Sequence, residues 1–298
     1  MSDVAEPTSG PGAAAPAGGS GAPLRALLIC HHDAPLHHEG VASWLAARAM
    51  LAGVVVVHEP RALLWRRLKR ERKRVGTLRL LDVLAMRVYY RLRLAAADAA
   101  WQEERLAAML AANPADRTGV PVLHTHSANS PEAEAFVRQC APDVAIALYK
   151  SILKESVFTA PAHGTWVWHP GICPEYRNAH GCFWALAAGD LGKVGMTLLR
   201  IDRGVDTGPT YGYFTYDYDE LRESHIRIQH RVVLDNLDAV VARMADAVAG
   251  RAAPLDVSGR PSAVWGQPWL TRYLRWKLAA RKRHREGRPR AGARAAVS

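Results

Sequence analysis

Short apolar runs recur along the chain, and longer segments of helical composition separate them. Five runs lack a helical stripe and are rich in β-branched or large apolar residues: LRALLIC (24–30), GVVVV (53–57), VPVLHT (120–125), DVAIALY (143–149) and GTWVWHP (164–170). Such runs are typical of strands buried on both faces of a sheet. Because strand-like and helical segments alternate, the pattern predicts an α/β fold with a mostly parallel sheet covered on both faces.

Helices are predicted where polar and apolar residues follow a helical period. The expected helices are residues 39–50, a helix over 130–140 that begins at Ser130 and Pro131, a short helix over 179–190, and one long amphipathic helix over 223–248. Residues 61–112 are Leu-, Arg- and Ala-rich with few breakers, which predicts an inserted helical pair. Alternation over 194–202 and 208–217 predicts two antiparallel strands at the end of the sheet.

Composition divides the chain into three parts. Residues 1–23 are mostly Pro, Gly, Ala and Ser, so we predict a disordered tail. Residues 24–250 form the predicted α/β domain, and residues 251–298 form a basic C-terminal tail. No apolar run is long enough for a membrane-spanning helix, and none has the pattern of a secretory signal.

The net charge of +11 comes from two segments of the 298-residue chain. Residues 61–74 carry +7 and residues 271–298 carry +9, which leaves the rest mildly acidic. Such segments are either solvated faces or surfaces for an anionic membrane or RNA. Large apolar residues interleave with the cations, and this favours a peripheral membrane surface over a nucleic-acid groove; they are Trp65, Leu68, Tyr273 and Trp276.

Four cysteines occur, and none belongs to a CxxC pair. A chain of this length does not need disulfides, so we expect reduced thiols and a cytoplasmic location. Cys182 lies two residues after His180, which leaves a catalytic cysteine as an alternative.

The segment HHDAPLHH (31–38) follows the first predicted strand. It contains no glycine, so it cannot form the turn that grips a dinucleotide pyrophosphate, and a nicotinamide enzyme is disfavoured. Its four histidines and Asp33 are ligand types for a metal, but neighbouring side chains on a turning chain point in different directions. We therefore expect no metal and interpret the segment as a polar or substrate-contacting loop.

His169 and Asp206 are the candidate catalytic pair. The Pro170–Gly171 break places His169 at the carboxyl end of its strand, where ligands bind in parallel sheets. Asp206 follows a later strand, in DRGVDTGP, and a carboxylate beside an imidazole fixes its tautomer and raises its basicity. Val167 shares the strand face of His169, whereas Trp166 and Trp168 point to the other face.

Residues 169–211, HPGICPEYRNAHGCFWALAAGDLGKVGMTLLRIDRGVDTGPTY, resemble the formyltransferase family. The shared pattern is His-Pro at a strand end, then Pro-x-Tyr-Arg, a Trp-Ala helix, a Gly-x-Thr strand and an Asp-x-Gly turn. The resemblance runs from about residue 140 to 230, extends loosely over 24–59, and leaves out 61–112 and the residues after 255. It implies a Rossmann-like sheet and transfer of a one-carbon formyl group from 10-formyltetrahydrofolate to an amine.

The resemblance also implies roles for particular residues. His169 stabilises the oxygen of the tetrahedral intermediate and moves protons, and Asp206 tunes His169. Two backbone segments match those that hold the pterin in the family; they are Ser151, Ile152 and Leu153, and Ile201, Asp202, Arg203 and Val205.

Val167 departs from the family pattern, which has asparagine two residues before the histidine. Valine cannot donate a hydrogen bond, and loss of one oxyanion donor costs about 10²–10³ in rate. We therefore consider Asn178 or His180 as substitute donors, because both lie in the following loop.

Three functions stay open. They are formyl transfer to a small amine, formyl hydrolysis with water as acceptor, and a catalytically impaired relative that binds a ligand or a partner. A methionyl-tRNA acceptor is disfavoured, because only 48 residues follow residue 250 and the tRNA enzyme carries an extra barrel domain there. The acceptor and the oligomeric state are not determined by the sequence.

Overall fold

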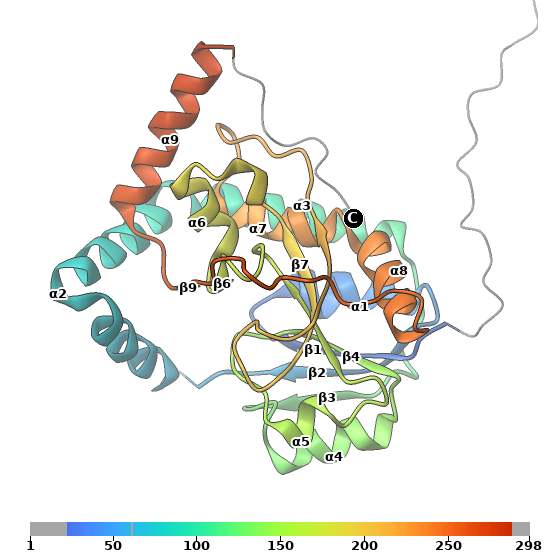
Figure 1. Cartoon of the computed structure of the whole chain (residues 1–298). Helices are drawn as coiled ribbons and strands as arrows, with labels where there is room; N and C mark the ends of the chain where they lie inside the picture. The colour runs from blue at the N-terminus through green and yellow to red at the C-terminus, as the bar shows by residue number, and fades with distance from the viewer. Residues whose placement is uncertain (1–22, 61, 288–298) are drawn as a thin grey trace, which may run out of the picture.

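The computed structural model describes residues 23–60 and 62–287. The predicted disordered tail lies outside the described residues, apart from Pro23. A seven-stranded sheet forms the centre of the molecule (Figure 1), in the order β3-β2-β1-β4-β5-β7-β8. Its strands are β1 (Ala26–His31), β2 (Leu51–Val57), β3 (Val122–Thr125), β4 (Val144–Leu148), β5 (Thr165–His169), β7 (Met196–Arg200) and β8 (Thr210–Phe214).

The sheet is mostly parallel, as predicted. Strands β3, β2, β1, β4 and β5 pair in parallel, whereas β7 pairs antiparallel with both β5 and β8. The predicted antiparallel end of the sheet is therefore present. The α/β fold class with a Rossmann-like sheet is confirmed.

Two apolar layers cover the sheet, because successive strand residues point to opposite faces. On β1, Leu28 and Cys30 join one cluster, and Leu27 and Ile29 join the other. The second cluster lies under α4 (Pro131–Cys140) and the short helix α5 (Glu155–Phe158), as Figure 1 shows. The larger cluster lies under the other helices; they include α1 (Ala42–Ala46), α3 (Ala95–Ala112), α6 (Gly181–Ala188), α7 (His225–Leu234) and α8 (Leu237–Val248).

Two predicted helices differ from the structure. The helix expected over 39–50 begins earlier, as a π-helical turn over Leu36–Val41 that continues into α1. The long helix expected over 223–248 is two helices that meet at Asp235 and Asn236. The Asn236 amide donates to the carbonyls of Val232 and Thr215, which draws the backbone out of the helical path.

The predicted helical insertion forms the connection between β2 and β3. It consists of α2 (Ala62–Arg93) and α3, and α2 bends at Gly76. Gly76 has φ 79° and ψ 171°, a conformation that only glycine adopts readily. In Figure 1 the two parts of α2 run in different directions along one side of the molecule.

Residues 251–287 pack on the domain and are not a free tail. Strand β9 (Val264–Trp265) pairs in parallel with β6 (Arg177–Asn178), in the loop after His169. The guanidinium of Arg260 forms a two-pronged ion pair with Glu175, at 3.0 and 2.7 Å. Helix α9 (Leu270–Arg285) then buries Tyr273 and Trp276 against the body of the protein. The periodicity of this segment did not predict the contact, because it joins residues about 85 positions apart.

Candidate active site

The candidate site lies at the carboxyl ends of β1, β4 and β5. The strand order reverses between β1 and β4, and ligands bind at such a switch point in open α/β sheets. His31 ends β1, and its Nε2 accepts a hydrogen bond of 2.9 Å from the backbone N–H of Lys150, just after β4. His169 ends β5, the next strand along the sheet.

His169 and Asp206 come together although 37 residues separate them. The Nδ1 atom of His169 lies 3.6 Å from Oδ2 of Asp206, and the side chains are 6% and 15% exposed. Nε2 of His169 lies 2.9 Å from the carbonyl oxygen of Tyr176. A carbonyl only accepts, so Nε2 carries the proton and Nδ1 faces the carboxylate. A proton arriving at Nδ1 would be stabilised by a neighbouring negative charge.

Two glycines let the loop after β5 close tightly around His169. A Cβ on Gly171 would lie 2.6 Å from the Tyr176 carbonyl and 2.8 Å from Nε2 of His169. A Cβ on Gly181 would lie 2.5 Å from Cα of Gly171. Side chains at either position would displace the histidine or the carbonyl that fixes it. In the sequence, the only sign of this tight closure was a glycine in each of the triplets HPG (169–171) and AHG (179–181).

Asp206 is positioned by backbone groups. Its Oδ2 accepts a hydrogen bond of 2.7 Å from the backbone N–H of Asn178. Asp206 and Asn178 both have left-handed backbone, with φ 51° and 74°, which Asp and Asn tolerate better than most residues. Upstream, Asp202 accepts from Gly204 N–H and from the Thr207 hydroxyl, which closes the turn that presents Asp206.

The two residues considered as substitute donors lie in different surroundings. The side-chain amide of Asn178 donates to the carbonyl of Trp265, so it joins β6 to β9. The His180 ring faces α7, with its centroid 5.9 Å from that of His225. Burial lowers the pKa of His180 to about 4, so the ring is neutral near pH 7. The structure therefore brings the Asn178 backbone to Asp206 and directs the His180 ring toward α7.

Val167 and the two predicted pterin-holding segments share one apolar cluster. Val167 and Ile201 pack against the layer that contains buried Leu153. Arg203, in the second segment, binds Glu155 at the start of α5, at 2.8 Å. Ile152 is 65% exposed, so an apolar side chain faces solvent beside this cluster. The remaining predicted residues are Ser151, which donates to Glu59 at 3.3 Å, Asp202 in the turn described above, and Val205, whose carbonyl accepts from Arg177.

Arg177 is a site residue to which the sequence analysis gave no role. Its Nη1 donates to the Val205 carbonyl at 3.0 Å, one residue before Asp206. Its Nε is buried and has no hydrogen-bond acceptor among the described residues. An unsatisfied buried donor is costly, so this N–H is a candidate partner for a ligand oxygen.

A second polar group adjoins the switch point and was also missed. His37, His180 and His230 all lie close enough to the Lys150 ammonium for its charge to lower their pKa values, after the larger effect of burial. Nδ1 of His37 is buried without a hydrogen-bond partner in the described part of the chain, whereas the His180 ring interacts with the Gln229 side chain. The sequence signal was the position of Lys150 directly after a buried strand.

Exposed histidines gather beyond the ends of β1, β2 and β3. The His32 and His58 rings stack with centroids 4.2 Å apart, and His58 Nε2 lies 2.9 Å from His124 Nδ1. Across residues 23–60 and 62–287, no three His, Cys, Asp or Glu side chains are arranged to hold a metal ion. The HHDAPLHH segment thus contributes to a histidine cluster and to the switch point.

All four cysteines are free and buried. Cys182 is the one considered as a nucleophile, but its thiol donates to the Gly195 carbonyl. Burial raises the pKa of Cys182 to about 12 and also raises that of Cys173 beside Asp206. These thiols are therefore poor nucleophiles near pH 7.

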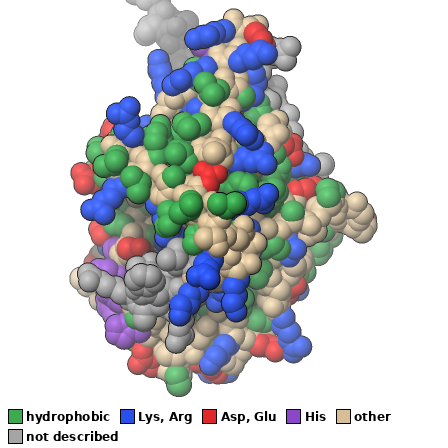
Figure 2. All heavy atoms as spheres, turned by 90° about the vertical axis from the view of Figure 1, so that its left-hand side faces the viewer, with side chains coloured by type: hydrophobic (Ala, Val, Ile, Leu, Met, Phe, Trp, Pro, Cys, Tyr) green, Lys and Arg blue, Asp and Glu red, His purple; other side chains and the backbone are tan. Residues whose placement is uncertain are grey.

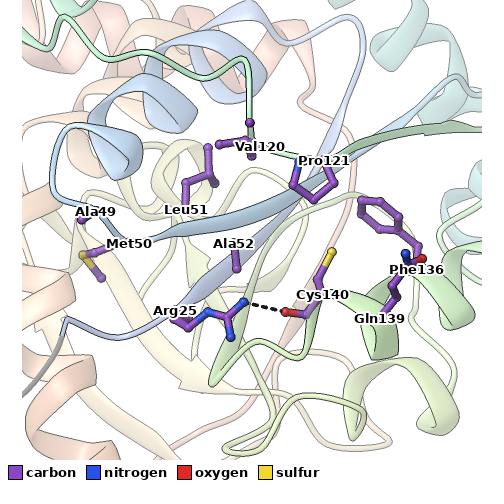
Figure 3. Close-up of a pocket in the computed structure, with 11 residues that line it drawn as sticks. Arg25, Ala49, Met50, Leu51, Ala52, Val120, Pro121, Phe136, Gln139 and Cys140 are labelled. Atoms are coloured by element: carbon purple, nitrogen blue, oxygen red, sulfur yellow. Dashed lines mark hydrogen bonds between the residues drawn. The ribbon is translucent and has the colours of Figure 1, made fainter.

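A cavity of about 500 Å³ lies at the opposite edge of the sheet (Figure 3). Its lining includes Arg25 and Leu51 at the amino ends of β1 and β2, and Arg25 donates to the Cys140 carbonyl at 3.0 Å. Ligands of parallel sheets bind at the carboxyl edge, so we do not assign this cavity to the candidate site.

Part of the chain is similar to known formyltransferases. The family profile described as "Formyl transferase" matches residues 95–238. The methionyl-tRNA formyltransferase of Sorangium cellulosum is 39% identical over 94 residues, which is 31% of this chain and 30% of that protein. The corresponding protein of Mycobacterium avium is 39% identical over 98 residues, 33% and 31% of the two chains. The match therefore spans about a third of the length of these curated relatives.

Solved structures of similar arrangement include a sugar N-formyltransferase from a Shewanella species. It has a TM-score of 0.48 and 12% identity, over 85% of this chain and 88% of that one. Glycinamide ribonucleotide transformylase 1 from Symbiobacterium toebii has a TM-score of 0.47 and 14% identity, over 80% and 96%.

The sequence resemblance is confirmed, and the profile match begins earlier than the resemblance did, at residue 95, so it takes in α3. None of the described helices is both long enough and apolar enough to cross a membrane. The formyl transferase profile matches residues 95–238, and this range includes His169 and Asp206.

Proposed function

We propose that this protein transfers a formyl group from 10-formyltetrahydrofolate to the amine of a small acceptor. The observation that carries the proposal is the His169–Asp206 pair, 3.6 Å apart at the carboxyl edge of the sheet and inside the family match. Formyl donation is the chemistry that the folate supplies. The four free thiols support a cytoplasmic location, where cysteines stay reduced.

The residues fit a flat, partly apolar donor. Exposed Ile152 and the cluster that contains Val167, Leu153 and Ile201 offer an apolar surface beside the pair. We assign the segments 151–153 and 201–205 to this ligand.

His169 moves the proton in this mechanism. The attacking amine forms a C–N bond to the formyl carbon and must lose a proton as the donor C–N bond breaks. Nδ1 of His169 takes that proton, and the Asp206 carboxylate stabilises the resulting imidazolium. The Tyr176 carbonyl keeps the ring oriented by holding Nε2–H. The proton then passes from Nδ1 to the folate nitrogen that leaves the formyl carbon.

The substitute for the missing asparagine is assigned to Arg177. Val167 cannot donate a hydrogen bond, whereas Arg177 has a buried N–H without an acceptor among the described residues. A guanidinium N–H stabilises a developing negative charge on the formyl oxygen. Asn178 takes part through its backbone N–H, which orients Asp206. The His180 ring faces α7 and Lys150, so we assign it to the part of the site that binds the acceptor.

The acceptor amine is assigned to the polar group at the switch point. Lys150 and the unsatisfied Nδ1 of His37 can bind a polar or anionic small molecule. The curated relatives are named for methionyl-tRNA, so a charged tRNA belongs in any acceptor test.

The test is a formyl-transfer assay with 10-formyltetrahydrofolate and a panel of amines, preceded by thermal-shift titration with a reduced folate. We expect folate to raise the unfolding temperature and formylated amine to appear only when an acceptor is present. Formate release without an amine would show a hydrolase instead. Folate binding without turnover, with turnover appearing in Val167→Asn, would show a catalytically impaired relative. Failure to bind any reduced folate would refute the proposal.

A further inference from the structure

Helices α2 and α9 lie against each other and form one face of the molecule, which we name the α2–α9 face. The guanidinium of Arg79 stands 4.9 Å from the Trp269 ring centroid, and the Tyr89 and Tyr273 ring centroids are 5.5 Å apart. Figure 2 looks onto this side of the molecule and shows apolar side chains among Lys and Arg. The helices are therefore fixed relative to each other by their inner sides, and their outer sides face solvent.

Large apolar side chains are exposed on the outer side of both helices. Seven of the eleven exposed large hydrophobics in the described chain lie here: Leu78, Leu81, Leu84, Val88 and Leu92 on α2, and Leu274 and Leu278 on α9. Leu78 is 84% exposed and Leu92 is 75% exposed. Positions 78, 81, 84, 88 and 92 recur at three- and four-residue spacing, so they form one stripe along α2. Single exposed leucines are ordinary, but a stripe of this kind marks an interaction surface.

The same face is strongly cationic. Residues 69–93 contain nine Lys or Arg and two acids, Glu71 and Asp82. Both acids are engaged, because Glu71 binds Arg74 at 2.6 Å and Asp82 accepts hydrogen bonds from Thr271. Helix α9 adds seven Lys or Arg and no acid, and two of these cations are engaged, because Arg283 binds Glu220 and Lys277 donates to backbone carbonyls. Exposed leucines among a large excess of cations over acids predict a partner that is both apolar and anionic.

We propose that the α2–α9 face binds the surface of an anionic lipid bilayer. The leucine stripe enters the boundary between headgroups and acyl chains, and the long cationic side chains reach the lipid phosphates from beside it. Each Lys or Arg near an anionic leaflet adds about 1 kcal/mol of attraction, so this number of cations suffices without a spanning helix.

A second copy of the chain fits this face poorly. Pairing two such stripes would bring two sets of Arg87, Arg91 and Arg93 to one interface, and residues 69–93 contain only Glu71, already bound to Arg74, and Asp82 to offset the repulsion. RNA also fits poorly. The exposed apolar residues are aliphatic, and bases stack on aromatic or guanidinium planes.

The experiment is vesicle flotation with the full chain, which does not depend on formyl transfer. Vesicles of phosphatidylcholine alone are compared with vesicles that also contain phosphatidylglycerol. We expect binding to the anionic vesicles only, weakening as salt is raised. The variant Arg87→Glu/Arg91→Glu/Arg93→Glu should lower binding at least about 100-fold. The variant Leu78→Gln/Leu81→Gln/Val88→Gln/Leu92→Gln should lower it at least about 10-fold.

Matched controls change the same chemistry elsewhere on the surface. Arg138→Glu/Arg251→Glu repeats the charge change, and Val122→Gln removes an exposed apolar side chain outside the face. These positions lie on other parts of the chain, so both variants should bind vesicles like the wild type. Leu221 and Arg222 are left unchanged, because they follow Glu220, which contacts α9. Circular dichroism and an unfolding curve confirm that every variant is folded.

Four results would overturn the proposal. The first is no binding of the wild type to anionic vesicles. The second is equal binding by the face variants and their controls. The third is a dimer, measured by sedimentation, that the leucine variant abolishes while vesicles are not bound, since that would assign the stripe to a second copy. The fourth is RNA, double- or single-stranded, that displaces the wild type from vesicles and no longer binds the leucine variant.

Discussion

Around His169 polar groups are buried, whereas on the α2–α9 face apolar groups are exposed. His169 is 5% exposed, and each ring nitrogen faces a protein oxygen. On the α2–α9 face, leucines are exposed and cations surround them. Burying a polar pair costs stability unless its groups are hydrogen-bonded, and an exposed leucine stripe marks an interaction site. The buried pair is therefore suited to catalysis, and the α2–α9 face is suited to binding another surface.

The largest expected effect comes from removing the charge of the buried pair. Asp206→Asn keeps an oxygen for the Asn178 N–H and tolerates the left-handed backbone, but it cannot stabilise an imidazolium. We expect kcat/KM for formyl transfer to fall by about 10²–10⁴ while folate binding changes little. Asp246→Asn, at a surface ion pair with Arg251, is the matched control. A loss no larger than that of the control would remove Asp206 from the mechanism.

Gly171→Ala should come next, because it disturbs the fixed orientation of His169. The new Cβ would lie 2.6 Å from the Tyr176 carbonyl and 2.9 Å from Cα of Gly181. We expect a loss of about 1–3 kcal/mol in the free energy of unfolding, together with reduced turnover. Gly192→Ala has no atom within 4 Å of its Cβ and should change neither, as measured by denaturant unfolding. An unchanged free energy of unfolding in Gly171→Ala would show that the loop after β5 can move to make room for the new Cβ, contrary to this prediction.

Acid pH should destabilise the protein through the histidines that are buried in neutral form. Burial lowers the pKa of His180 and of His230 to about 4, whereas an unfolded histidine titrates near 6.5. The unfolded state therefore binds more protons between these values, and stability falls as pH drops from about 6.5 to about 4. From pH 7 to pH 5 we expect these two residues to contribute a loss of about 2 kcal/mol, after allowance for their partial exposure.

The double variant His180→Gln/His230→Gln tests this pH dependence. Its unfolding free energy should fall less between pH 7 and pH 5 than that of the wild type. His163→Gln, at an exposed position, serves as the control and should reproduce the wild-type curve. Parallel curves for wild type and double variant would contradict the expected linkage.

The smallest effect is expected from the leucine stripe. Leu78→Gln and Leu81→Gln should change the free energy of unfolding by less than about 0.5 kcal/mol, because these side chains are 84% and 60% exposed. Val83→Ala, at a buried position of the same helix, should cost about 1–2 kcal/mol. The two measurements together test whether the stripe belongs to the core or to a partner. A stripe variant as costly as Val83→Ala would assign it to folding.

Local patterns predicted most of the sheet. All five parallel strands and the antiparallel end lie within a few residues of the predicted runs, because buried strands leave continuous apolar stretches. The motif spacing also predicted that His169 and Asp206 would meet. Helix interruptions were harder, since the break at Asn236 depends on its bond to the distant Thr215 carbonyl.

The sequence by itself determined the alternation of strands and helices, the family motifs and the strongly cationic segments. Only the tertiary structure decided that β9 pairs with the loop after His169, that Arg177 holds an unsatisfied N–H there, and that the His180 ring faces α7. Periodicity and composition describe how a segment meets water or a core within a few residues. Contacts across 85 residues depend on which surfaces the completed sheet brings together, and no local pattern encodes them.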